Sequence, residues 1–289
     1  AHKSVDMGRG RTGGLAAARL GRRLMEIPAA SSKPSPWRII AASVRGSSHE
    51  KKNQPCQDAV RWQSLPGDSW IAAVADGAGS AALAEAGSAA ACAASLDFLG
   101  RRLREVPVPA TEEKWRLLLA DSLQAARQAL VAEAAARQAP LRDLATTLLL
   151  LAVTPEAVAG AQVGDGAALV ADSSGNLLTL TRPCLNEYLN ETTFLTSESA
   201  LEKPQLQFRP GQINQAALLS DGLQMLALKM PEGTPHRPFF APLFRFLETA
   251  GDPAAAQDQL AAFLRSSRIQ QRANDDLTLL LAGRIPSPA

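Results

Sequence analysis

The chain contains few of the residues that build disulfide frameworks or zinc sites. Three Cys and three His occur among its 289 residues, and aromatic residues make up only 4%. Cys56, Cys92 and Cys184 stand apart, with no CxxC motif and no Cys/His cluster, which argues against both kinds of site. Because free cysteines suit a reducing compartment, we expect the protein to be cytoplasmic.

Long apolar runs are also missing from the sequence. No segment approaches the roughly 20 apolar residues that a transmembrane helix needs, and the N-terminal residues lack the apolar core of a signal peptide. We therefore expect no membrane partner. Hydrophobic residues still make up 46% of the chain, which is ample for a core built mainly from aliphatic side chains.

Positive charge is concentrated near the N-terminus. Residues 1–38 carry eight Lys or Arg and two acids, so the rest of the chain carries −4 of the net +2. This slightly acidic body lacks the basic stripe that is typical of nucleic-acid-binding domains, and we expect no such partner. Residues 1–36 show little periodicity, which predicts a flexible basic tail before a single domain at 37–285.

The domain alternates between short apolar runs and amphipathic segments. Apolar residues recur at helical spacing in 83–104 and 112–138, and a polar surface flap is expected at 182–203. Strands are predicted at 37–45, 58–62, 70–75, 146–153, 157–163, 167–171, 177–180, 216–219 and 277–281, and further helices at 221–228 and 253–266. This order predicts an α+β fold, a four-layer α-β-β-α sandwich of two antiparallel sheets flanked by helices.

Carboxylates follow several predicted strands at the point where each strand ends. They are Asp58, Asp76, Asp165, Asp221, and Asp275 with Asp276. Each alone has an ordinary explanation as a turn or helix-capping residue. Because all of them end strands that we expect to be buried, one end of the sandwich would gather several negative charges, which need cations nearby.

The ligand type indicates which cations these would be. Carboxylates without His or Cys suit Mg²⁺ or Mn²⁺ better than Zn²⁺. Two such ions about 4 Å apart would hold a phosphate group and lower the pKa of a bridging water enough to give hydroxide. The pattern therefore favours hydrolysis of a phosphate ester, with a serine or threonine oxygen as the leaving group.

Five short motifs occur in an order that resembles the metal-dependent protein phosphatases of type 2C, in a bacterial form. The resemblance spans about residues 43–281. The motifs are Asp76-Gly77-Ala78-Gly79 for the family's Asp-Gly-X-Gly, Ala145-Thr146-Thr147 for Gly-Thr-Thr or Gly-Ser-Thr, Gly164-Asp165 for Gly-Asp-Ser-Arg, Ser220-Asp221-Gly222 for Ser-Asp-Gly, and Asp275-Asp276-Leu277-Thr278 for Asp-Asn-X-Thr.

The resemblance implies a role for each acidic residue. Asp221 and Asp275 would hold one metal ion and share Asp76 with a second ion, to which Gly77 offers its carbonyl. Asp58 would orient a water molecule bound to the ions. Asp165 and Asp143 would correspond to carboxylates that hold a third ion in bacterial relatives.

The resemblance also implies the reaction and its participants. We expect a protein serine/threonine phosphatase that uses two Mn²⁺ or Mg²⁺ ions. Asp165 and Asp143 would allow a third ion to bind. Phosphoproteins are the expected substrates, a serine/threonine kinase is a candidate partner, and we expect a monomer.

Several positions depart from the family pattern. Gln57 stands where the family has an acid, and Asn53 stands where it has a phosphate-binding Arg. Arg45 is our candidate for that role, with Lys51 or Lys52 as alternatives. His49 is expected to be solvated in its loop. These departures keep open a second interpretation, a catalytically attenuated phosphatase-fold module that binds phosphoproteins or a kinase partner.

A further departure concerns the proton donor. Ala78 replaces a His that serves as proton donor in the animal enzymes, so a water bound to the ions would protonate the leaving group.

Overall fold

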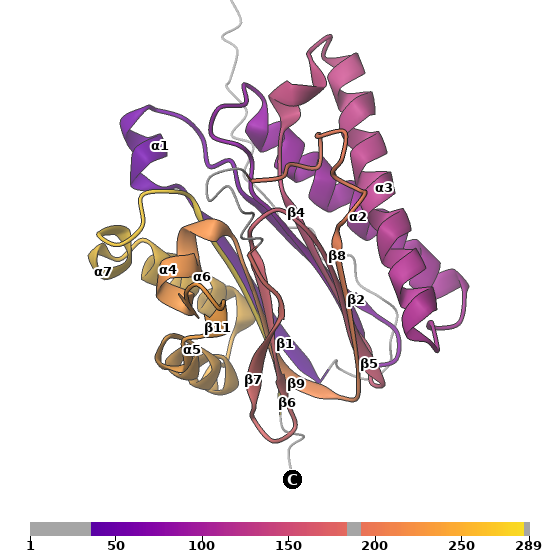
Figure 1. Ribbon diagram of the computed structural model, residues 1–289. Helices are drawn as coiled ribbons and strands as arrows, with labels where there is room; N and C mark the ends of the chain where they lie inside the picture. Colours follow the sequence, from indigo (N-terminus) through magenta and orange to yellow (C-terminus); the bar gives the residue numbers. More distant parts are fainter. Residues whose placement is uncertain (1–35, 184–191, 286–289) are drawn as a thin grey trace, which may run out of the picture.

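The protein folds as two antiparallel five-stranded sheets that face each other, each covered on its outer side by helices (Figure 1). The computed structural model describes residues 36–183 and 192–285. This arrangement confirms the predicted four-layer sandwich of the α+β class. Nearly all of the predicted tail and the middle of the predicted flap lie outside the described residues.

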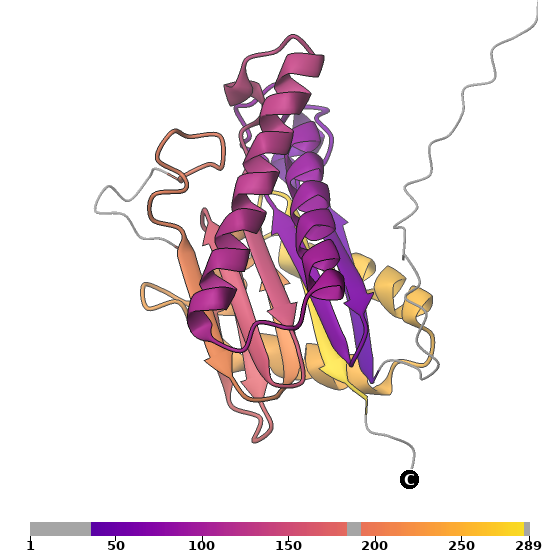
Figure 2. The ribbon, with the colours of Figure 1, turned by 90° about the vertical axis from the view of Figure 1, so that its right-hand side faces the viewer.

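The first sheet has the strand order β2-β3-β4-β5-β8. Its strands are β2 (Ala59–Leu65), β3 (Ser69–Ala75), β4 (Leu148–Val153), β5 (Ala157–Val163) and β8 (Gln205–Pro210). Every residue of the three middle strands is buried, because both faces of this part of the sheet are covered. Helices α2 (Ala84–Glu105) and α3 (Glu112–Ala136) lie side by side across the outer face (Figure 2).

The second sheet has the strand order β1-β12-β9-β6-β7. Its strands are β1 (Trp37–Val44), β12 (Leu277–Arg284), β9 (Ile213–Leu219), β6 (Ala167–Asp172) and β7 (Leu177–Thr181). Helices α5 (Arg237–Thr249) and α6 (Pro253–Leu264) pack on its outer face. Among the described residues, no helix is both long enough and apolar enough to cross a membrane.

Short elements connect these layers. They are α1 (Ser47–Lys51), η1 (Leu141–Leu144), η2 (Asp221–Leu223), α4 (Gln224–Ala227), the hairpin of β10 (Leu228–Lys229) and β11 (Thr234–Pro235), and α7 (Ser267–Gln270). Two of them lie at predicted site residues: α1 begins two residues after Arg45, and η2 begins at Asp221. They therefore shape the ends of the sheets rather than the core.

Apolar side chains fill three layers, one between the sheets and one beneath each pair of helices. In the middle layer, the rings of Trp37 and Trp70 meet edge to face with their centroids 5.5 Å apart. Both tryptophans belong to the core between the sheets. Such a core leaves polar chemistry only at the ends of the sandwich.

Most predicted elements are present with boundaries shifted by a few residues, but several were missed, among them β8, α5 and α1. Strand β8 alternates polar and apolar residues from Gln205 to Arg209, a pattern typical of a half-buried strand that our prediction overlooked. Helix α5 contains Pro242 inside its span, a residue that sequence reasoning treats as a helix breaker. Helix α1 has only five residues, too few to show a helical period.

The difference in burial between core and surface leucines gives a prediction about stability. Leu150 lies in β4 with 0% exposure, so Leu150→Ala should lower the free energy of unfolding by about 2–5 kcal/mol. Leu117 on α3 is 61% exposed, and Leu117→Ala should change it by less than about 0.5 kcal/mol. Chemical denaturation of both variants measures the difference, and equal losses would contradict this assignment of the core.

Candidate active site

Three carboxylates from three separate strand ends meet at one end of the sandwich. Oxygen atoms of Asp76, Asp165 and Asp221 lie within 4.8 Å of one another. Asp76 follows β3 and Asp165 follows β5 in the first sheet, whereas Asp221 follows β9 in the second. The cluster therefore depends on the packing of the two sheets and could hold a metal ion.

The loop that carries Asp76 is fixed by the Thr pair of the second motif. The carbonyl of Asp76 accepts hydrogen bonds from Thr146 Oγ1 at 2.9 Å and from the Thr147 backbone N–H at 2.8 Å. The Asp76 N–H donates to Thr147 Oγ1 at 3.0 Å. A Cβ at Gly77 would lie 2.7 Å from the Ala84 carbonyl, so this position has no room for a side chain. Together these contacts orient the Asp76 side chain.

The buried side-chain amide of Gln162 holds the loop that carries Asp165. Nε2 of Gln162 donates to the carbonyls of Gly164 at 3.0 Å and Gly166 at 2.8 Å, on either side of Asp165. Gly164 has a φ of 109°, a conformation that favours glycine. Thr192 Oγ1 donates to Asp165 Oδ2 at 2.7 Å. Sequence reasoning identified Gly164-Asp165 but not these supports.

The three carboxylates repel one another in a half-buried site. Burial is the largest cause that raises the pKa of Asp76 well above its ordinary value, and it raises the pKa of Asp221 to about 6. The negative charges of Asp58 and Asp221 add to the rise in the pKa of Asp76. Burial likewise raises the pKa of Asp165.

The residues present fit divalent cations. Oδ1 of Asp165 and Oδ1 of Asp221 are buried and have no hydrogen-bond partner among the described residues. Buried carboxylate oxygens without partners are costly, and a bound cation would satisfy them. Because the donor set consists of oxygen atoms alone, it suits Mg²⁺ or Mn²⁺.

Asp58 lies behind this cluster and links two of the motifs. Its Oδ2 accepts hydrogen bonds from Ser220 Oγ and from Thr278 Oγ1, both at 2.7 Å. Its Oδ1 is buried and has no partner among the described residues. Burial is the main cause that raises the pKa of Asp58 to about 7. The structure thus places Asp58 next to the motifs that carry Asp221 and Asp275.

The remaining predicted site residues lie outside the group of three. The Asp275 side chain is 56% exposed, although its charge contributes to the raised pKa values of Asp221 and Asp165. Asp143 lies in η1 with Oδ1 at 4.0 Å from Arg142 Nε. Arg45 is exposed and donates to the Gln54 carbonyl at 3.2 Å. The structure therefore brings together only part of the predicted set.

A second polar group was missed by sequence reasoning. His49, Asp275 and Asp276 have ligand atoms within 4.8 Å of one another. Contrary to the expectation of a solvated side chain, His49 is buried in α1, with Nδ1 at 3.0 Å from Asp276 Oδ1 but without the geometry of a hydrogen bond. The expectation was wrong because the β1–β2 loop folds back onto the last motif.

Asp276 fixes that loop. Its Oδ1 accepts from the Gly46 N–H at 2.7 Å and its Oδ2 from the Gln57 N–H at 2.5 Å. A carboxylate offers two acceptor oxygens, whereas the Asn of the family pattern offers one. The departure from Asn to Asp at position 276 was the signal in the sequence that could have identified this clamp.

Comparison with known proteins agrees with this geometry. Residues 45–265 match the model of a family described as Protein phosphatase 2C. Serine/threonine-protein phosphatase 3 of Escherichia coli (strain K12) is 34% identical over 257 residues, which cover 85% of this chain and 98% of that protein.

Solved structures share the fold at lower identity. A bacterial serine phosphatase superposes with a TM-score of 0.60 at 17% identity, covering 87% of this chain and 99% of that one. The serine/threonine phosphatase Stp1 from Staphylococcus aureus gives 0.58 at 17%, covering 91% and 99%. The catalytic domain of the serine/threonine protein phosphatase PstP, in complex with 2 manganese ions, gives 0.57 at 19%, covering 86% and 98%. Because the family model matches most of the chain and a relative matches along nearly its whole length, this chain belongs to the protein phosphatase 2C family.

Proposed function

We propose that this protein hydrolyses phosphoserine and phosphothreonine in protein substrates with the help of divalent cations. The observation that carries the proposal is the cluster of Asp76, Asp165 and Asp221, whose oxygens lie within 4.8 Å of one another and include two buried atoms without partners. The related Escherichia coli protein is named a serine/threonine-protein phosphatase, which supports this substrate class.

Each carboxylate has a proposed place around the cations. Asp76 is central, Asp221 and Asp165 flank it, and Asp275 approaches from the exposed edge. When bound, the cations supply an activated water and charge neutralisation for the phosphate. The manganese complex of PstP supports Mn²⁺, and Mg²⁺ suits the same oxygen ligands. The carbonyl of Gly77 and the carboxylate of Asp143 are further proposed ligands, on the resemblance of their motifs.

Asp58 is proposed to orient the attacking water. Ser220 and Thr278 hold its Oδ2, which leaves the buried Oδ1 without a partner among the described residues. Arg45 is proposed to bind the phosphate from the β1–β2 loop, which Asp276 holds in place. A kinase partner, a monomeric state and a cytoplasmic location remain predictions.

The first test replaces the proposed ligands. Hydrolysis of a phosphothreonine peptide should require Mn²⁺ or Mg²⁺, and Asp76→Asn and Asp221→Asn should each lower kcat by at least about 10²-fold, because the activated water contributes several kcal/mol. Asp172 is a matched control, since its Oδ1 only accepts turn hydrogen bonds from the N–H groups of Ser174 and Asn176. Asp172→Asn should keep full activity.

Two outcomes of this test would contradict the proposal. Undiminished turnover after exhaustive chelation would remove the need for cations. Wild-type protein that binds cations but hydrolyses no phosphopeptide would instead support the attenuated binding module.

A second test uses pH in the absence of metal. Asp58 and Asp221 have pKa values of about 7 and about 6 in the folded protein against an ordinary value of 3.8. The folded state therefore binds more protons than the unfolded state, and stability should fall as pH rises through this range. In chelator, Tm should drop between about pH 4 and pH 7, and Mn²⁺ should restore more stability at pH 7 than at pH 5. A Tm that rises over this range in chelator would contradict the assignment.

A third test concerns the clamp. Asp276→Asn removes one of two buried acceptors and should lower the free energy of unfolding by about 1–3 kcal/mol. It should also raise KM for a phosphopeptide, because the loop with Arg45 loses an anchor. Asp252 is a matched control, since it also accepts two backbone N–H bonds but is exposed as a helix N-cap. Asn caps helices as well as Asp does, so Asp252→Asn should be nearly neutral, and equal effects of the two substitutions would count against the clamp.

A further inference from the structure

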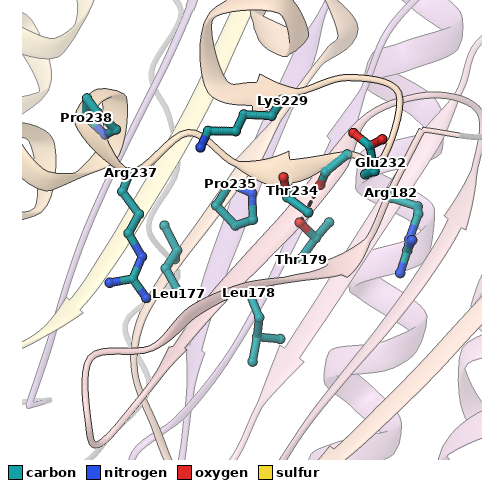
Figure 3. Close-up of a pocket in the computed structure, with 11 residues that line it drawn as sticks. Leu177, Leu178, Thr179, Arg182, Lys229, Glu232, Thr234, Pro235, Arg237 and Pro238 are labelled. Atoms are coloured by element: carbon teal, nitrogen blue, oxygen red, sulfur yellow. Dashed lines mark hydrogen bonds between the residues drawn. The ribbon is translucent and has the colours of Figure 1, made fainter.

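A basic groove lies beside the carboxylate cluster, between β7, the β10–β11 hairpin and the start of α5. It has a volume of about 500 Å³, and its charged lining residues are Arg182, Lys229, Arg237 and Glu232. Figure 3 shows Lys229 and Arg237 toward one end and Arg182 with Glu232 toward the other, with Pro235 and Thr179 between them. The groove therefore carries three positive charges against one negative charge.

Among the described residues, the salt bridges leave the positive charges of the groove without a carboxylate partner. Within residues 36–183 and 192–285, no carboxylate forms an ion pair with Arg182, Lys229 or Arg237. The nearby acid of β6, Asp172, lies 3.9 Å from Arg209 instead. All three cations of the groove are exposed. Unpaired cations around one concavity attract anions, whereas the catalytic cluster itself is acidic.

The first turn of α5 adds to this potential. The helix has 13 residues and begins at Arg237, with no acidic residue in its first turn and no side-chain cap on its N-terminus. The N-terminal end of a helix carries a partial positive charge that acts over about one turn. This contribution has the same sign as that of Lys229 and Arg237 at the same end of the groove.

Hydrogen bonds connect both walls of the groove to the loop that carries Asp165. On one wall, the carbonyl of Arg182 accepts a hydrogen bond of 3.1 Å from Gln162 Nε2, the atom that also holds both neighbours of Asp165. On the other wall, Gln224 Nε2 donates to the Asp165 carbonyl at 2.5 Å, and Gln224 begins the short helix that continues into β10. These hydrogen bonds place the Arg182 end of the groove next to the loop that carries Asp165.

The hairpin that forms the far wall is tied to the sheet. Thr179 Oγ1 donates to the Gly233 carbonyl at 2.7 Å, which joins β7 to the turn of the hairpin. Leu177 and Pro235 supply apolar surface between the cations. The groove thus combines a fixed apolar floor with charged rims, as a site for an extended peptide requires.

We propose that this groove binds acidic residues that flank the phosphorylated Ser or Thr of the substrate. The proposal rests on the proposed phosphatase function and adds a sequence preference to it. Charge complementarity selects carboxylate side chains, and the position of the groove beside the Asp165 loop selects a segment of the same polypeptide.

The test compares phosphothreonine peptides that differ only in their flanking residues. One peptide carries Glu at the four positions before and the four positions after the phosphothreonine. The second peptide carries Gln at the same positions. With Mn²⁺ at low ionic strength, kcat/KM of the wild-type enzyme should be about 3- to 10-fold higher for the Glu peptide, which corresponds to a few exposed ion pairs. Added salt should reduce the ratio.

Substitutions that remove positive or negative charge from the groove show whether the preference for the Glu peptide arises there. Lys229→Gln combined with Arg237→Gln should bring the ratio close to one, whereas Glu232→Gln should increase it. Turnover of p-nitrophenyl phosphate should stay unchanged in all of these variants, because it does not reach the groove. Arg101→Gln combined with Arg102→Gln is the matched control, since it removes two exposed cations from α2 on the opposite outer layer.

The outcomes separate this proposal from the proposed function. Hydrolysis of both peptides at equal kcat/KM, or an equal loss of preference in the α2 control, would overturn the groove while leaving the phosphatase intact. Absence of hydrolysis of either peptide with Mn²⁺ or Mg²⁺ would overturn the proposed function itself.

Discussion

The repulsion between buried carboxylates is the constraint on which the site depends. Asp58, Asp76 and Asp221 come from loops that the two sheets force together, and burial penalises their charge. Without cations, these groups therefore hold protons at a higher pH than an ordinary aspartate does. Cation binding and folding are therefore coupled, because whatever neutralises the cluster also relieves the strain of assembling it.

The surrounding structure keeps the cluster in place against that repulsion. Buried strands on both sides leave no freedom for the loops that end them, and Thr146, Thr147 and Gln162 hold the Asp76 and Asp165 loops by their backbones. Because these contacts reach backbone atoms, the carboxylate oxygens stay available to cations. A site built in this way is preorganised before any ligand arrives.

Two features distinguish this member of the protein phosphatase 2C family. Asp276 replaces the family's Asn and clamps the β1–β2 loop through two backbone amides, with His49 buried beside it. The basic groove next to Asp165 gives the acidic active-site end a neighbouring surface of opposite charge. We propose that the first feature positions residues around the phosphate and that the second binds the polypeptide that carries it.

The sequence by itself determined the layers and most of the acidic residues. Apolar periodicity reports local burial, so it predicted the helices and strands, and the order of the motifs pointed to Asp76, Asp165 and Asp221. Only the tertiary structure decided that Asp275 lies at the exposed edge, that His49 is buried, and that Arg182, Lys229 and Arg237 surround one groove. These outcomes depend on contacts between segments far apart in the chain, and a local pattern of polar residues is the same whether a loop meets solvent or another loop.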